Sequence, residues 1–151
     1  MVKIYCDMDG TIVDFNKGVI ALTGKHPDDI PDKYMWPAVM KAKTFFRDLD
    51  WLPDGKELWN YILPHNPAII TGQPSSFIAR DHKKEWCARE LGNHIDVTVC
   101  KSKEKYLYGN PEDILIDDRQ DVGDLWINMG GIHIYHTSAK NSIIELKNLG
   151  F

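Results

Sequence analysis

Five short apolar runs without polar alternation recur along this chain and constrain its fold more than any other feature. They are Val2–Cys6, Ala68–Ile70, Ile95–Val99, Ile114–Ile116 and Ile132–Tyr135. Runs of this kind are typical of strands covered on both faces, as in a parallel sheet. Helical stretches lie between them, and alternating strands and helices predict an α/β protein with a doubly wound parallel sheet.

Three of the intervening stretches carry helix start and stop signals. Ser75 or Ser76 can cap a helix that runs to Leu91, just before a glycine. Two further helices are predicted over 121–128 and 138–149, each followed by glycine. The first two lie between apolar runs and can supply the crossovers that parallel strands need, whereas the third follows the last run.

One segment departs from the regular alternation of strands and helices. About 60 residues separate the first two runs, far more than a simple crossover requires. We interpret 16–52 as a small helical cap inserted after the first strand, over the carboxyl edge of the sheet. Residues 1–15 and 53–151 then form the core, with 54–63 as the returning helix. The alternative is a proline-rich surface loop, but the aromatic content of the segment argues against plain disorder.

Composition excludes several classes of partner. The formal net charge is −4, which gives no general attraction to long nucleic acid or to an anionic membrane. No stretch approaches the roughly 18 apolar residues of a membrane span. The three cysteines are widely spaced and form no CxxC pair, which favours reduced thiols and a cytoplasmic location. The oligomeric state stays open, with a homodimer as one alternative.

Polar residues suited to phosphate chemistry follow three of the five runs. Asp7–Thr11 follows the first, Thr71-Gly72 the second and Asp117-Asp118 the fourth. In open α/β sheets, ligands bind at the carboxyl ends of the strands, so we expect these residues to meet at one edge. A single aspartate at a strand end is commonplace as a turn residue. Three such ends in one chain point instead to a site.

The residue types fit the transfer of a phosphoryl group. A phosphate ester is an anion, so an attacking carboxylate needs a cation to offset the charge, and carboxylate oxygens suit Mg²⁺. Asp7 and Asp9 lie two residues apart, and Gly10 lets the chain turn sharply after them. One carboxylate can then face phosphorus while the other exchanges a proton with the leaving oxygen.

These segments resemble motifs of the haloacid dehalogenase (HAD) superfamily. The resemblance of Asp7–Thr11 to the first motif implies that Asp7 is the nucleophile and that Asp9 is the general acid and base. It also implies that the main-chain carbonyl of Asp9 binds Mg²⁺, together with Asp7, Asp117 and Asp118. Thr71 and Gly72 resemble the second motif, which binds the phosphoryl oxygens.

The third motif of that superfamily is a lysine that offsets phosphate charge. Lys101, Lys103 and Lys105 all precede the fourth motif. The resemblance favours Lys105, with Lys103 as the second choice. A charge run of this kind is usually a solvated face, so we expect at least two of the three to be exposed.

A closer resemblance is to the 5′(3′)-deoxyribonucleotidase family and its short bacterial and phage relatives. It is carried by Ile12–Phe15 after the first motif, by Phe45–Leu49, by Leu52–Gly55 and by Arg119. The insert is shorter than in the animal enzymes of that family, and the second motif continues as Gly72-Gln73-Pro74, where those enzymes have a serine. Base and sugar preference therefore do not carry over.

The resemblance implies a phosphatase that acts on nucleoside monophosphates. Four aromatic side chains are candidates for its substrate pocket, with core packing as the alternative: Phe15, Trp36, Phe45 and Phe46. Other interpretations are a phosphatase for another small metabolite or for a nucleic-acid end, and a catalytically silent module that binds phosphate.

Overall fold

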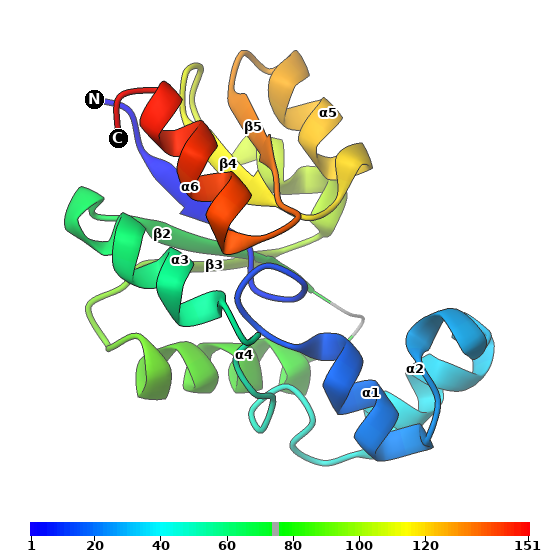
Figure 1. Cartoon of the computed structure of the whole chain (residues 1–151). Coiled ribbons are helices and arrows are strands. Elements are labelled where there is room, and N and C mark those ends of the chain that lie inside the picture. The colour runs from blue at the N-terminus through cyan, green and yellow to red at the C-terminus, as the bar shows by residue number, and fades with distance from the viewer. Residues whose placement is uncertain (74–75) are drawn as a thin grey trace.

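A single parallel sheet forms the centre of the molecule. In the computed structural model, which describes residues 1–73 and 76–151, five strands pair in the order β3-β2-β1-β4-β5 (Figure 1). All four pairings are parallel, as the uninterrupted apolar runs predict. The strands are β1 (Ile4–Cys6), β2 (Ala68–Gly72), β3 (Val97–Cys100), β4 (Ile114–Asp117) and β5 (Ile132–Tyr135).

Helices connect the strands and cover the sheet. The α-helices are α1 (Phe15–Thr23), α2 (Asp32–Lys41), α3 (Gly55–Ile62), α4 (Phe77–Glu90), α5 (Gln120–Asn128) and α6 (Ala139–Asn148). Short 3₁₀ segments are η1 (Pro27–Asp29), η2 (Leu63–His65) and η3 (Ser102–Leu107). Ser76 is the N-cap of α4, whereas the alternative cap, Ser75, lies outside the described residues. No helix in the described part of the chain is long and apolar enough to cross a membrane.

The two faces of the sheet bury two apolar clusters. The larger one joins alternate strand residues such as Ile4 and Ile116 to α3, α4 and α6. The smaller one places Leu115, on the opposite face of β4, against Val122 and Trp126 of α5. Successive residues of a strand point to opposite faces, so a strand covered on both sides must be apolar at every position. This explains why the runs lack polar alternation.

The strands extend further at their carboxyl ends than the apolar runs indicate. Thr71 and Gly72 pair with β3, and Asp117 pairs with Tyr135 of β5. At the other ends, β1 and β3 begin two residues later than expected, at Ile4 and Val97. Pairing fixes the backbone of Thr71, Gly72 and Asp117, so the sheet itself holds these predicted site residues.

The segment 16–52 contains most of α1 and all of η1 and α2, whereas 42–52 forms turns and irregular structure. Asp14 caps α1 by accepting a hydrogen bond from the Lys17 amide, and Gly24 ends the helix with a φ of 76°. Figure 1 shows α1 and α2 side by side beyond the sheet, on the side opposite to the chain termini. Val19 and Val39 nevertheless belong to the same apolar cluster as the sheet residues. The division into core and cap therefore stays a prediction.

Candidate active site

Three carboxylates meet at the carboxyl edge of the sheet. Asp7 directly follows β1, Asp117 ends β4, and Asp118 is the next residue. Each offers an oxygen that lies within 4.8 Å of the others. Asp7 and Asp117 are buried, and Asp118 is half-buried. The fold thus joins two of the three strand ends that the sequence singles out.

Lys105 lies between two of these carboxylates. Its Nζ donates to Asp7 Oδ1 at 2.8 Å and to Asp117 Oδ2 at 2.7 Å, and the side chain is buried. Burial alone would lower the pKa of Lys105, but Asp7 and Asp117 outweigh it and raise that pKa above its usual value. Lys101 and Lys103 are exposed. Lys105, the first choice, is therefore the lysine that contacts the carboxylate cluster, and its role in offsetting phosphate charge stays a prediction.

The carboxylate cluster has more negative charge than Lys105 can offset. Burial, followed by repulsion from Asp117, raises the pKa of Asp7. Burial and then Asp7 and Asp117 raise the pKa of Asp118 to about 8. Asp118 Oδ1 is buried without a hydrogen-bond partner among the described residues. Crowded carboxylates with a spare oxygen ligand fit a hard divalent cation such as Mg²⁺.

Gly10 allows the first loop to pass beneath Asp118. Its φ is 81°, a conformation that other residues adopt with strain. A Cβ at this position would clash with the Asp118 carboxylate. The loop is closed by hydrogen bonds from the Gly10 amide to the Val13 carbonyl and from the Thr11 amide to the Met8 carbonyl. Glycine is therefore required both for the turn and for the approach of Asp118.

Lys83 is a buried lysine that the motifs did not reveal. Its Nζ donates to Asp9 Oδ2 at 2.9 Å, to Thr71 Oγ1 at 3.0 Å and to the Gly72 carbonyl at 2.7 Å. The sequence did carry a signal for it. On a helix over 76–91, Ala79, Lys83 and Trp86 share one face, and all three are buried. A lysine on the apolar face of a core helix requires a buried partner.

The second strand end presents its backbone, not its threonine side chain, to the open site. Thr71 has no exposed surface, and its hydroxyl accepts a hydrogen bond from Lys83. Gly72 borders the cavity, and a Cβ there would clash with the Ser102 hydroxyl. Ser102 also lines the cavity, although no sequence motif indicated it. The role predicted for Thr71 in binding phosphoryl oxygens stays a prediction.

A cavity of about 220 Å³ opens over these residues. Its polar wall contains Asp7, Asp9, Gly72, Gln73, Lys83, Ser102, Lys105 and Arg119. Its aromatic wall consists of Phe15, at the start of α1, and of Trp36 and Phe46 from the insert. Anionic chemistry and an apolar surface thus share one open cavity, which is a usual composition of a small-molecule site.

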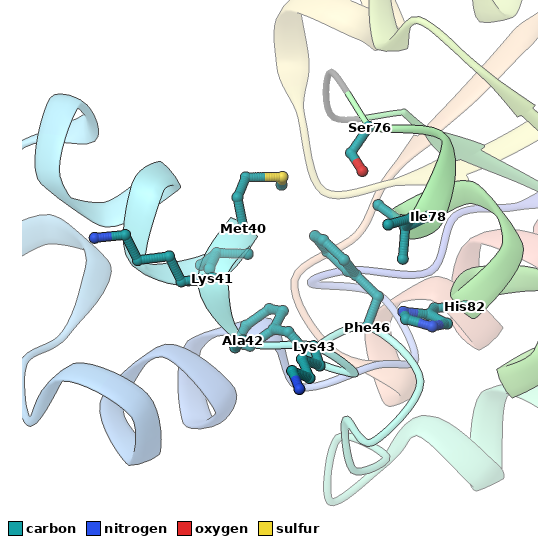
Figure 2. A pocket seen from close by; sticks show the side chains of 11 residues that line it. Met40, Lys41, Ala42, Lys43, Phe46, Ser76, Ile78 and His82 are labelled. Carbon is teal, nitrogen blue, oxygen red and sulfur yellow. The ribbon is translucent and has the colours of Figure 1, made fainter.

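The fourth predicted aromatic, Phe45, lies outside this lining. It packs edge-on against Phe15 and Phe46, with ring centroids 5.7 Å and 5.0 Å apart. It lines a neighbouring cavity of about 220 Å³ instead, between the end of α2 and α4. Figure 2 shows this second space, with Ile78 and His82 of α4 near Phe46, which borders both cavities. Phe45 therefore supports the aromatic wall through its ring contacts with Phe15 and Phe46.

Arg119 lies at the edge of the site. It lines the cavity, but its guanidinium also pairs with Asp121 at 2.7 Å, and the side chain is exposed. Its backbone amide donates to Asp117 Oδ1 at 2.9 Å. This bond helps to hold Asp117 in the orientation that Lys105 also fixes.

The fold matches solved hydrolases across nearly the whole chain, and one of them is a HAD-superfamily hydrolase. No family model matches the sequence, and no curated protein matches it. A HAD-superfamily hydrolase from Ehrlichia chaffeensis is similar in structure, with a TM-score of 0.58 and 12% identity over 99% of this chain and 97% of that one. A hydrolase from Streptococcus pneumoniae gives a TM-score of 0.54 and 13% identity over 97% and 96%. The chain therefore has the HAD-like α/β fold that its strand pattern and motifs predicted.

Proposed function

We propose that this protein is a Mg²⁺-dependent phosphomonoesterase of the HAD superfamily that hydrolyses nucleoside monophosphates. One observation carries the proposal. Lys105 bridges Asp7 and Asp117 beside Asp118, in the wall of a cavity that also contains Asp9 and Gly72. This arrangement supports roles for Asp7 as nucleophile, for Asp9 as acid and base, and for Lys105 as the cation beside a bound phosphate.

The cation would be held by the acidic cluster. Asp7, Asp117 and Asp118 would supply carboxylate oxygens, and the main-chain carbonyl of Asp9 would add a fourth ligand. When bound, Mg²⁺ offsets the charge of the phosphate and of the carboxylate that approaches it. Lys105 contributes a fixed positive charge that is already in place before the substrate binds.

In the first step, an oxygen of Asp7 attacks phosphorus and the ester P–O bond breaks. The leaving alkoxide takes a proton from Asp9, so the products are an alcohol and an aspartyl phosphate. Lys105 holds Asp7 Oδ1, which keeps the carboxylate from rotating and leaves its second oxygen as the attacking atom.

In the second step, water attacks the phosphorus of the aspartyl phosphate. Asp9 removes a proton from that water, the bond between phosphorus and the Asp7 oxygen breaks, and inorganic phosphate leaves. Asp7 is thereby restored as a carboxylate and Asp9 as an acid. The two aspartates need separate positions at one cavity, and both line the cavity described above.

The aromatic wall supports a nucleoside as the leaving group. Phe15, Trp36 and Phe46 line the same cavity as Asp7 and Asp9, so the part of a substrate beyond its phosphate could lie against their rings. Aromatic faces stack on nucleobases, and this stacking is worth about 1–3 kcal/mol per base in nucleic-acid sites. A small sugar phosphate would leave this surface uncovered.

Phosphate release from p-nitrophenyl phosphate tests the activity itself. We expect turnover with Mg²⁺ and its loss with EDTA, together with loss in Asp7→Asn while the fold is retained. A protein that binds phosphate but releases none from any ester would be a silent binding module. An Asp7→Asn variant that keeps more than a small fraction of the rate would exclude Asp7 as the nucleophile.

A substrate panel tests the class of leaving group. We expect kcat/KM for 5′- and 3′-nucleoside monophosphates to exceed that for sugar phosphates and for phosphorylated oligonucleotide ends. Equal turnover of sugar phosphates would replace the nucleotidase proposal by that of a general small-metabolite phosphatase. Preference for oligonucleotide ends would identify a nucleic-acid end as the substrate.

A further inference from the structure

We propose that Lys83 is a positioning residue that holds Asp9 and the loop after β2 in the geometry for protonating the leaving group. This inference rests on the proposed phosphatase function and deepens it. Lys83 comes from α4, which lies outside every motif that the sequence presents. Its ammonium group nevertheless donates hydrogen bonds to Asp9, after the first strand, and to Thr71, at the end of the second.

The hydrogen bonds of Lys83 exclude it as a ligand of the phosphate in this arrangement. An ammonium group has three donors, and Lys83 uses one each on Asp9 Oδ2, Thr71 Oγ1 and the Gly72 carbonyl. The side chain is 3% exposed. Lys83 borders the cavity with little exposed surface, and because its donors are occupied it acts on the reaction through its three partners.

Its first partner is the oxygen of Asp9 that a substrate can reach. Asp9 Oδ1 is buried and lacks a hydrogen-bond partner in the described part of the chain. Asp9 nevertheless lines the cavity with a quarter of its side chain exposed. Oδ2 is therefore the carboxylate oxygen available to the leaving group, and Lys83 fixes it at 2.9 Å.

Its other two partners belong to the loop that borders the phosphate position. Because Thr71 Oγ1 accepts from Lys83, the hydroxyl must direct its own hydrogen elsewhere. The bond to the Gly72 carbonyl fixes the orientation of the peptide that follows, at the cavity wall. Lys83 thus sets the distance between the proton donor and the loop that faces the phosphoryl group.

The surroundings of Lys83 are rigid enough for such a role. One turn further along α4, Trp86 Nε1 donates to the Leu49 carbonyl at 2.8 Å, and the Cys87 sulfur lies 3.6 Å from that of Met8. The Phe46 ring from the insert lies 5.0 Å from Lys83 Nζ. Asp9 is partly exposed, and ion pairs that water can reach contribute little to stability, so stability alone does not account for this pair.

The test compares two leaving groups in Lys83→Met. p-Nitrophenolate leaves without a proton, whereas the alkoxide of a nucleoside 5′-monophosphate needs one from Asp9. The ratio kcat/KM covers steps only as far as formation of the aspartyl phosphate, so the later role of Asp9 as a base does not enter. General acid catalysis contributes about 10²–10⁴-fold. We expect kcat/KM for the nucleotide to fall at least about ten times further than that for p-nitrophenyl phosphate.

Lys84→Met is the matched control, because Lys84 is the next residue on α4 and is exposed. It should leave both substrates unchanged. Equal losses on the two substrates in Lys83→Met would reduce Lys83 to a structural role and overturn the inference, while the phosphatase function would stand. A wild-type protein inactive on both substrates would overturn the proposed function and this inference with it.

A second variant covers the case in which Lys83→Met does not fold. Lys83→Arg keeps the positive charge but spreads its donors over a planar group, so it cannot reproduce three bonds made from one nitrogen. It should show the same selective loss on the nucleotide. Wild-type selectivity in Lys83→Arg would show that charge alone suffices and would overturn the positioning role.

Discussion

Removing the charge of Lys105 should destabilise the fold as well as abolish turnover. Lys105→Met keeps the length of the side chain but leaves Asp7 and Asp117 facing each other without a cation. Lys105 and both of these carboxylates are nearly or fully buried, so solvent screens little of the repulsion. Breaking a buried ion pair by removing one partner costs about 3–5 kcal/mol.

For a chain of this length, that cost corresponds to a fall in Tm of about 6–20 °C. The fall should be larger at pH 8 than at pH 5, because the raised pKa values of Asp7 and Asp118 favour uptake of protons at the lower pH, which removes part of the repulsion. Mg²⁺ should recover part of the lost stability by supplying a cation at the same place. Thermal unfolding at both pH values, with Mg²⁺ and with EDTA, measures these effects.

Lys103→Met is the control, since Lys103 precedes Lys105 by two residues on η3 and is exposed. Its Tm and its activity should stay close to those of the wild type. A fall in Tm of less than about 2 °C for Lys105→Met, or an equal effect of Lys103→Met, would refute the view that Lys105 neutralises the carboxylate cluster.

Three further predictions follow from the site. The folded state raises the pKa of Asp118 to about 8. Above about pH 4, the metal-free folded protein therefore keeps a proton that the unfolded chain has lost, and the free energy of unfolding should decline as pH rises towards 8. Mg²⁺ should therefore raise Tm more at pH 8.5 than at pH 6.5, and an equal rise at both would contradict this. Gly10→Ala should cost about 1–3 kcal/mol of stability in urea unfolding and weaken the stabilisation by Mg²⁺, because the added Cβ strains the turn and meets Asp118. Trp36→Ala should raise KM for the preferred nucleotide roughly 5- to 150-fold with kcat little changed, because a stacking surface is lost. Tyr34→Ala, an exposed control outside the cavity lining, should leave KM unchanged. An unchanged KM for Trp36→Ala in steady-state kinetics would exclude Trp36 from the substrate pocket.

Much of the fold could be predicted because strands that are buried on both faces of a sheet form uninterrupted apolar runs in the sequence. All five apolar runs form strands, and the helices over 76–91, 121–128 and 138–149 begin and end within one or two residues of their predicted bounds. The gathering of Asp7 with Asp117 and Asp118 also followed from topology, since parallel strands share one carboxyl edge. Strand ends were less certain, because Thr71 and Asp117 are polar yet continue the ladder.

The features that escaped prediction depend on tertiary contacts. Lys83 reaches Asp9 only because α4 packs against the sheet with that face inward. Thr71 is covered by the same lysine, so the predicted ligand of the phosphate has no exposed surface here. Phe45 and Phe46 are neighbours in sequence, yet only Phe46 lines the cavity of the candidate site, whereas Phe45 lines the neighbouring one. Motif spacing specifies residue types at a site but does not specify which side chain blocks another.

Acid quench of the wild-type protein during turnover of a substrate radiolabelled in its phosphate tests the central role of Asp7 most directly. We expect labelled protein whose label maps by peptide mass spectrometry to the segment containing Asp7, and no label in Asp7→Asn. Label on a different residue, or wild-type turnover without any labelled protein under rapid quenching, would contradict attack by this aspartate.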